Sequence, residues 1–309
     1  MDFVNVFKDL FVLFIVAGVG YTSSRLGVIT NRGAHEFSNV LMKLTFPALI
    51  IASMNQPFSR ELLISSVHIV IISVCVHAVF VLTAYLGRRR FKNIPHGQMA
   101  VLELCLIFGN TTFTGYPVVN AMYGQLGLFY ASAFNFIVIV LLFTYGILLL
   151  SGHSNGNLFK RLLNPGLIAV ILGYGLFFTQ IKLPYVILTS LQWVGNLTIP
   201  LAMLIVGNSL AGMPLKEIFA DKRLYAVTAL RLLIFPLIIM VVLKMLRVDP
   251  LLTGVAVMMS ATPAMLMAGV FARSYGCDGS LGDRGVLLNH LLAFITIPFL
   301  IFLLEIIQI

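Results

Sequence analysis

The stretch ELCLIFGNTTFTGYPVVNAMYG, from Glu103 to Gly124, starts as an apolar run and becomes polar and helix-breaking in its middle. Pro117 cannot donate a helical hydrogen bond, and Gly115 gives the same turn little support. Backbone groups freed deep in a membrane are tolerated where they are buried in protein or line a cavity. The polar run beside the predicted break therefore either satisfies these groups or joins them in a ligand site; it consists of Asn110, Thr111, Thr112 and Thr114.

A second segment of this kind, SATPAMLMAG from Ser260 to Gly269, lies in the other half of the chain. Thr262 and Pro263 stand together within it. Two broken helices that meet near the membrane midplane would point their N-terminal ends at a shared space, and such ends attract anions. We therefore expect an anion-binding site where the two breaks meet.

The two halves also share a further motif: LTFPALII begins at Leu44, and LTIPLAML begins 153 positions later at Leu197. Thr45 and Thr198 stand two residues before the prolines, where their hydroxyl groups either bond back to their own helices or face the predicted cavity. Two repeats with paired broken helices are typical of secondary transporters.

Composition places most of the chain in lipid. It is 60% hydrophobic and 10% charged, with a mean hydropathy of +1.02, whereas soluble domains carry about 25% charged residues. Each span needs roughly 20 apolar residues. We predict an all-α membrane protein with ten transmembrane helices, at residues 9–22, 37–54, 64–86, 99–121, 127–150, 165–180, 185–211, 224–246, 251–272 and 285–307.

Spans one to five form the first predicted repeat, residues 1–150, and spans six to ten form the second, residues 165–309. Because five is an odd number, the second repeat enters the membrane from the opposite side, and the repeats are inverted. The predicted inner loops hold thirteen Lys and Arg against five outside, which favours both termini outside. The formal charge of +9 is thus a topology signal and a contact with membrane lipid, and it gives no indication of nucleic acid binding.

Two titratable residues within spans are candidates for coupling transport to H⁺ or Na⁺. Glu103 lies two helical turns before Asn110, so it either carries a proton or cation on the cavity face or sits at the inner interface beside the Arg88–Lys92 cluster. His290 either takes part in proton coupling or is a satisfied interior histidine. We predict no cofactor and no metal site.

Two basic residues also fall within spans or at their edges. Lys43 either snorkels to the interface or supplies positive charge for a substrate anion. Arg231 needs a polar partner, and the sequence indicates none. His68 and His77 are nine residues apart, on nearly opposite helix faces, which argues against a joint metal site. The zinc-protease motif H-E-x-x-H is absent, and we do not predict an enzyme.

Four segments together resemble the auxin efflux carrier family, the bacterial relatives of the plant PIN-formed proteins: FPALIIASM in span two, GNTTFTGYP in span four, WVGNLTIPLAMLIVGNSLA in span seven and SATPAMLMAGVFARSYG in span nine. The likeness covers essentially the whole chain. It implies a fold similar to that of bile acid symporters and sodium/proton antiporters, in which the broken spans four and nine cross. In such a fold, spans 1, 2, 6 and 7 form a scaffold domain, and spans 3–5 and 8–10 form a transport domain.

The resemblance also implies an organic-anion substrate such as malate, malonate or auxin, a multi-pass protein of the cytoplasmic membrane, and a homodimer formed through scaffold domains. Asn110 matches the family asparagine, and Pro117 and Pro263 match the crossover prolines. Many bacterial relatives carry another asparagine a few residues after the span-nine proline, where Met267 stands here. The missing amide makes the pocket more apolar and favours a larger, partly hydrophobic carboxylate over a small dicarboxylate.

We therefore predict a secondary transporter of organic anions that exports or exchanges them by elevator-type alternating access. Two alternatives stay open: a transporter fold that senses a ligand without moving it, and an anion channel. The residues predicted to bind substrate are Thr45, Asn110, Thr111, Thr112, Gly115, Pro117, Thr198, Thr262, Pro263 and Met267.

Overall fold

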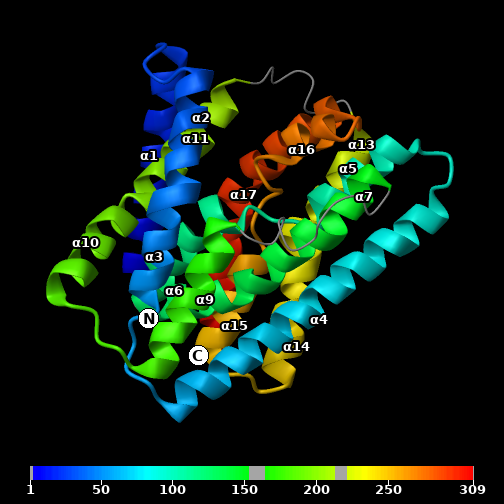
Figure 1. Cartoon of the computed structure of the whole chain (residues 1–309). Helices are drawn as coiled ribbons and strands as arrows, with labels where there is room; N and C mark the ends of the chain where they lie inside the picture. Colours follow the sequence, from blue (N-terminus) through cyan, green and yellow to red (C-terminus); the bar gives the residue numbers. More distant parts are fainter. Residues whose placement is uncertain (1–2, 153–163, 213–220, 309) are drawn as a thin grey trace.

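The computed structural model describes residues 3–152, 164–212 and 221–308 and folds them into a bundle of helices (Figure 1). The predicted all-helical class is confirmed for these ranges, in which the strand-like pairing is limited to one isolated bridge.

The predicted connectors, residues 151–164 and 212–223, lie largely outside the described residues. The same holds for three basic residues that contributed to the predicted orientation: Lys160, Arg161 and Lys216.

The helices follow one another with few interruptions. The first half contains α1 (Phe3–Arg25), α2 (Asn31–Val40), the π-helical turn η1 (Leu41–Thr45), α3 (Phe46–Ser53), α4 (Arg60–Arg90), α5 (His96–Ile107), the π-helical turn η2 (Thr111–Gly115), α6 (Tyr116–Leu141), the π-helical turn η3 (Leu142–Gly146) and α7 (Ile147–Ser151). The second half contains α9 (Pro165–Thr179), α10 (Tyr185–Asn196), α11 (Thr198–Ala211), α13 (Lys222–Ala229), the π-helical turn η4 (Leu230–Ile234), α14 (Phe235–Met245), α15 (Pro250–Ser260), α16 (Ala268–Ser274) and α17 (Gly279–Gln308).

Several of these helices are long and apolar enough to cross a membrane. Helix α6 turns at Gly124, whose φ of +59° is one that glycine adopts readily, so the 41-residue helical segment Thr111–Ser151 that contains α6 is bent. The fold fits a multi-pass membrane protein, while the number of ten spans and the inverted repeat remain predictions. Within the described residues, five helices meet the length and hydropathy of a span: Arg60–Arg90, Thr111–Ser151, Tyr185–Ala211, Lys222–Met245 and Gly279–Ile306.

Helices α5 and α15 both end in the protein interior, and the segments that follow them lie side by side as a short antiparallel bridge. The Asn110 N–H donates to the Pro263 carbonyl at 2.6 Å. The Met265 N–H donates to the Phe108 carbonyl at 3.1 Å. The two predicted breaks therefore meet, and each satisfies backbone groups that the other leaves free.

The first break lies earlier in the chain than predicted. Helix α5 ends at Ile107 and helical structure resumes at Thr111, whereas Pro117 lies in the first turn of α6. Proline is tolerated there because its missing N–H is less needed in a first turn. The wider π-helical turn η2 precedes it, and the same arrangement recurs at Pro47 after η1 and at Pro236 after η4.

On one side of the crossing, α1 packs along α11, and α3 packs against α9 and α10 (Figure 1). Glycine permits the close approach. A Cβ on Gly20 would lie 2.4 Å from the Leu204 carbonyl oxygen, and one on Gly173 would lie 2.7 Å from Met54 Cγ. Gly20 and Gly173 hold matching positions in the predicted repeats, so each half packs its glycine against the other half.

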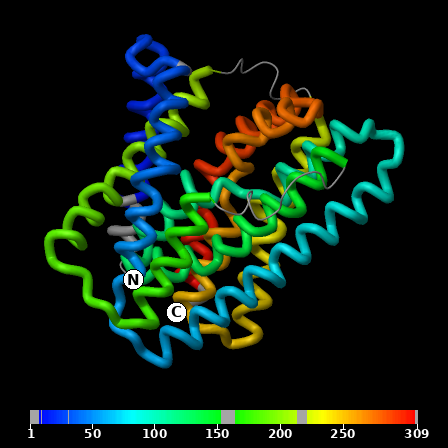
Figure 2. Tube along the Cα trace, viewed as in Figure 1, coloured from blue at the N-terminus to red at the C-terminus, as the bar shows by residue number. Residues whose placement is uncertain are grey.

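On the other side, α4 and α15 pack against α6, α14 packs against α15, and α16 packs against α17. The Cα trace places both chain ends toward the same end of the bundle (Figure 2). The crossing lies between these two groups of helices, which positions the cavity described next.

Candidate functional site

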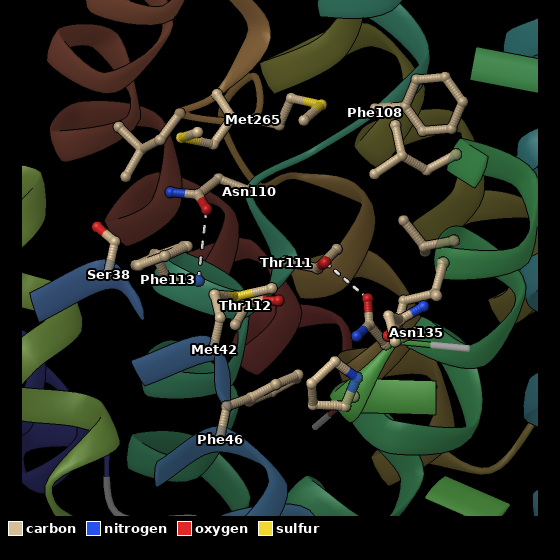
Figure 3. Close-up of a pocket in the computed structure, with 18 of the residues that line it drawn as sticks. Ser38, Met42, Phe46, Phe108, Asn110, Thr111, Thr112, Phe113, Asn135 and Met265 are labelled. Atoms are coloured by element: carbon tan, nitrogen blue, oxygen red, sulfur yellow. Dashed lines mark hydrogen bonds between the residues drawn. The ribbon is translucent and has the colours of Figure 1, made fainter. Parts of the chain in front are cut away.

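A cavity of about 320 Å³ lies beside the crossing. Ser38, Met42 and Phe46 of the α2–η1–α3 segment form one wall, and they face Thr112 and Phe113 at the start of η2 (Figure 3). Residues of the crossing, of α6, η3 and α16, and of the start of α9 also line the cavity. A cavity of about 300–1,000 Å³ with mostly apolar walls and a few polar groups is typical of small-molecule sites.

The structure brings some of the predicted substrate-binding residues together and separates others. Asn110, Thr111, Thr112 and Met267 line the cavity. The remaining predicted residues are not among its described lining residues: Thr45, Gly115, Pro117, Thr198, Thr262 and Pro263.

Asn110 organises the polar contacts at the first break. Its Oδ1 accepts a hydrogen bond from the Phe113 N–H at 3.3 Å and caps the helix that begins at Thr111. Its Nδ2 donates to Thr114 Oγ1 at 3.0 Å and to His290 Nε2 at 3.1 Å. The first N–H groups of a helix have no acceptor within that helix and attract anions. Thr111 and Thr112 are these first residues, and both line the cavity.

Asn135 on α6 is a polar lining residue that the sequence did not single out. Its Oδ1 accepts a hydrogen bond from Thr111 Oγ1 at 2.7 Å. Its Nδ2 has no hydrogen-bond partner, although only 1% of the residue is exposed and the Tyr116 hydroxyl lies nearby. An unpaired buried donor is costly, so a ligand acceptor here would be stabilising. The signal in the sequence was an amide within the apolar span 127–150.

The charged and titratable side chains at the cavity are basic. Lys43 on η1 and His35 on α2 line it, and both are exposed. Its described lining residues include no Asp or Glu. The position of Lys43 fits the second role considered for it, a positive charge beside a bound anion.

Arg231 on η4 is 1% exposed, and its partners at the crossing are two backbone carbonyl groups and the Thr262 hydroxyl. Its Nε donates to the Thr262 carbonyl at 2.8 Å, and its Nη1 donates to the Leu106 carbonyl at 2.5 Å. The Leu106 carbonyl lies in the last turn of α5, where the partial negative charge of a helix collects, and Thr262 lies two residues after the end of α15. The guanidinium also lies over the Phe80 ring, 5.6 Å from its centroid. Arg231 therefore holds the two broken helices together.

Neither arrangement predicted for Thr45 and Thr198 is observed. Both are buried, neither lines the cavity, and neither hydroxyl has a hydrogen-bond partner. The prolines that follow them are accommodated by backbone geometry instead: Pro47 and Pro200 both lie within helices.

Two other predicted residues support the crossing. A Cβ on Gly115 would lie 3.0 Å from Met259 Sδ, so the missing side chain lets η2 approach α15. The Thr262 hydroxyl donates to the Met259 carbonyl at 3.0 Å. These residues pack the broken helices against each other rather than face a ligand.

Glu103 lies away from the cavity, in an ion pair with Arg88. The Arg88 Nε donates to Oε1 at 2.8 Å, and Nη2 donates to Oε2 at 2.6 Å. This is the arrangement considered as the alternative to a coupling role, beside the Arg88–Lys92 cluster. A coupling role for Glu103 stays a prediction.

His290 on α17 does not line the cavity but contacts the Asn110 side chain at 3.1 Å. It lines a small void of about 30 Å³ between α1, α11 and α17. Its Nδ1 contacts the Val286 carbonyl at 2.8 Å, and it is 3% exposed. His290 is thus a satisfied interior histidine that is also joined to the cavity through Asn110. Within the described ranges, no group of three or more His, Cys, Asp or Glu side chains is arranged to hold a metal ion.

Comparison with known proteins agrees with this architecture. The family model described as "Membrane transport protein" matches residues 5–160 and 154–301, a range that includes both breaks and the cavity. The chain belongs to the membrane transport protein family. The resemblance to auxin efflux carriers seen in the four sequence segments is thereby confirmed.

Two archaeal relatives of this membrane transport protein align over nearly their whole length. An uncharacterized transporter of Methanocaldococcus jannaschii is 26% identical over 294 residues, which cover 93% of this chain and 94% of the relative. An uncharacterized transporter of Methanothermobacter thermautotrophicus is 27% identical over 304 residues, which cover 96% of this chain and 98% of the relative. The family and these relatives identify the chain as a membrane transporter.

Proposed function

We propose that this transporter carries organic anions as a secondary carrier and binds their carboxylate at the N-terminus of the helix that begins at Thr111. One observation supports this most directly. The cavity at the crossing combines a helix N-terminus with Lys43, and its described lining contains no acidic side chain. A carboxylate placed there would meet positive potential and unpaired donors rather than repulsion.

The walls support a particular class of anion. The cavity has an apolar part, lined by Phe46, Phe113, Met265 and Met267. It also has polar groups, which are the amides of Asn110 and Asn135 and the ammonium of Lys43. A carboxylate with one apolar portion would satisfy both regions. A small dicarboxylate would leave its second carboxylate against methionine, which is costly because a buried charge needs a partner. We therefore favour a partly hydrophobic monocarboxylate such as an aromatic acid over malate or malonate.

The position of the cavity supports alternating access. Its lining residues come from α2, η1 and α9 on one side and from the crossing, α6 and η3 on the other. The first set belongs to the proposed scaffold domain and the second to the proposed transport domain. An elevator movement of the second group past the first would carry the cavity across a cytoplasmic membrane, with both termini outside and two copies paired through their scaffolds.

The test is uptake of labelled carboxylates into proteoliposomes, with indole-3-acetate, other aromatic and aliphatic monocarboxylates, malate and malonate compared at equal concentration. We expect saturable uptake of a monocarboxylate. Asn110→Ala should raise its KM at least about tenfold, since it removes a side-chain amide that can donate to the bound carboxylate. Lys43→Met should raise KM about two- to fivefold, and more at low ionic strength.

Lys92→Met is the matched control for Lys43→Met, because Lys92 is an exposed lysine outside the cavity. It should leave KM unchanged. Saturable uptake that is unaffected by Asn110→Ala would contradict the proposed site. Tight carboxylate binding without uptake would indicate a sensor, and single-channel current steps would indicate a channel.

A further inference from the structure

We propose that His290 is the binding site of a proton that is carried together with the organic anion. This inference rests on the proposed function and names its coupling ion. The observation behind it is the chain of contacts from His290 through the Asn110 side chain to the start of the helix at the cavity.

The contacts fix the tautomer of His290. Its Nδ1 lies 2.8 Å from the Val286 carbonyl oxygen, which can only accept, so Nδ1 carries the hydrogen. A neutral imidazole has one N–H, and Nε2 is therefore an acceptor. The Asn110 Nδ2 donates to it at 3.1 Å. In this state His290 is neutral and fully paired.

The same contacts fix the orientation of the Asn110 amide. With Nδ2 directed at His290 and Thr114, Oδ1 is left to accept from the Phe113 N–H. Asn110 thus occupies the helix N-terminus that a substrate carboxylate would use. The neutral state of His290 holds this cap in place.

A proton on Nε2 of His290 reverses the preferred orientation of the Asn110 amide. Both ring nitrogens of His290 then donate, and Nε2 faces the donor Nδ2 of Asn110. The amide relieves this clash by turning its Oδ1 toward His290, which places Nδ2 beside the Phe113 N–H, so that two donors need an acceptor there. The helix N-terminus is then open to an anion in the cavity. Proton binding and anion binding therefore favour each other, and by linkage the effect is reciprocal.

Charge balance points the same way. His290 is 3% exposed, and a buried imidazolium needs a negative partner. The other residues that line its void are apolar, threonine or proline, with no acid among those described. A substrate carboxylate in the cavity beside Asn110 would supply the missing negative charge. The void, at about 30 Å³, has room for about one water molecule, through which the proton could exchange.

No other described titratable group supplies the negative charge that a protonated His290 needs. Glu103 is paired with Arg88, and Arg231 is occupied by carbonyl groups at the crossing. None of the described titratable side chains on helices packed against α17, or on α17 itself, lines the void of His290. They are Lys8, Tyr21 and Arg25 on α1; His96, Glu103 and Cys105 on α5; Lys222, Arg223 and Tyr225 on α13; Arg231 on η4; Lys244 on α14; Arg273 on α16; and Asp283, Arg284 and Glu305 on α17.

The experiment measures protons taken up on binding, by titration calorimetry of the purified protein with the transported carboxylate in buffers of different ionisation enthalpy near pH 7. We expect up to one proton per anion in the wild type, and an affinity that rises as pH falls, by at most about tenfold per pH unit. His290→Gln offers Asn110 an acceptor that does not titrate. It should bind the anion with no proton uptake and no pH dependence.

His77→Gln is the matched control. His77 is also buried, and its Nδ1 also contacts the carbonyl four residues earlier, that of Ser73, but it does not line the cavity or the void. It should keep the proton uptake of the wild type. If His290→Gln fails to fold, Asn110→Ser provides the second variant: its shorter side chain keeps a helix cap and loses the link to His290, so proton uptake should vanish.

The outcomes separate the two proposals. Anion binding without proton uptake in the wild type, or proton uptake that persists in His290→Gln, overturns the role of His290 and leaves the anion carrier intact. Proton-linked binding with no uptake into proteoliposomes supports His290 and contradicts transport. A folded wild type that binds none of the carboxylates overturns both.

Discussion

The two breaks meet at one place but offer a ligand different chemistry. The first is capped by the Asn110 side chain and leads into a helical segment of 41 residues, Thr111–Ser151. The second has Met267 at its N-cap position, with no side-chain hydrogen bond, and leads into α16, which has seven residues. Polar recognition therefore comes from one half of the molecule, and the other half supplies an apolar wall.

The hydrogen bonds of the crossing show which residues of the two breaks occupy equivalent positions. The Asn110 N–H and the Met265 N–H make equivalent bonds to Pro263 and Phe108, so Met265 is the counterpart of Asn110. The sequence resemblance had instead placed the missing asparagine at Met267. Both methionines line the cavity, but it is Met265 whose N–H pairs with the first break, at the Phe108 carbonyl.

The largest effect is expected where both breaks depend on one side chain. Arg231→Met leaves the Leu106 and Thr262 carbonyls unpaired in the interior, at about 1–3 kcal/mol each. We expect the free energy of unfolding to decrease by about 2–6 kcal/mol, seen as a lower unfolding temperature in lipid nanodiscs. Arg89→Met is the control, because Arg89 is exposed, and it should change stability by less than about 0.5 kcal/mol. Equal stability of the two variants would show that Arg231 does not join the breaks.

The next prediction compares the two residues paired in the bridge, Gly109 and Ala264. A Cβ on Gly109 would lie 1.9 Å from Arg231 Nη2 and 2.1 Å from Thr262 Oγ1. Gly109→Ala should therefore destabilise the protein by about 1–3 kcal/mol through overpacking. The opposite change, Ala264→Gly, should cost at most about 1 kcal/mol. Thermal unfolding of the two variants side by side measures the difference, and a larger loss for Ala264→Gly would contradict the described packing.

A third experiment adds to the second break what it lacks. Met265→Asn places an amide at the counterpart of Asn110 and should improve dicarboxylate binding about tenfold, the value of one hydrogen bond to a charged group of about 1.5 kcal/mol. Met267→Asn should give a smaller gain. Competition by malonate against the monocarboxylate substrate measures both. A larger gain at residue 267 would show that the register of the crossing does not set recognition.

The smallest effect belongs to a polar contact distant from both breaks. Arg223 donates to the Asp221 carboxylate and holds the pKa of that carboxyl below its ordinary value of 3.8. A lowered pKa stabilises the fold above the ordinary value, and this stability is lost as pH falls through the lowered one. Asp221→Asn should therefore cost less than about 1 kcal/mol at pH 7 and nothing at strongly acidic pH. A pH-independent loss measured by thermal unfolding would mean that Asp221 acts through its helix cap alone.

Several features of this fold were readable from the sequence. Glycine and proline within two apolar segments predicted that both would break, and composition predicted a helical membrane protein. The exact position of the first break was not readable, because a proline can end a helix or occupy its first turn. Pro117 does the second, after the π-helical turn η2. Which of these occurs depends on the pairing of Phe108–Asn110 with the second half.

The candidate site was predictable in part for the same reason. Asn110, Thr111 and Thr112 could be found because they stand beside the break in the sequence. Asn135 and the carbonyl partners of Arg231 depend on which helix faces pack together across 24 to 125 positions of the chain. No local pattern carries that information.

Substrate protection of a single cysteine in the cavity shows directly whether the anion binds at the helix N-terminus beside Thr111. Thr112→Cys, in a background with Cys75 and Cys277 changed to serine, is treated with a charged thiol reagent in the presence and absence of the transported carboxylate. Lys92→Cys in the same background is the control. We expect the anion to slow modification of residue 112 and to leave that of residue 92 unchanged. Equal rates at residue 112 with and without a saturating, transported anion would contradict binding at this helix N-terminus.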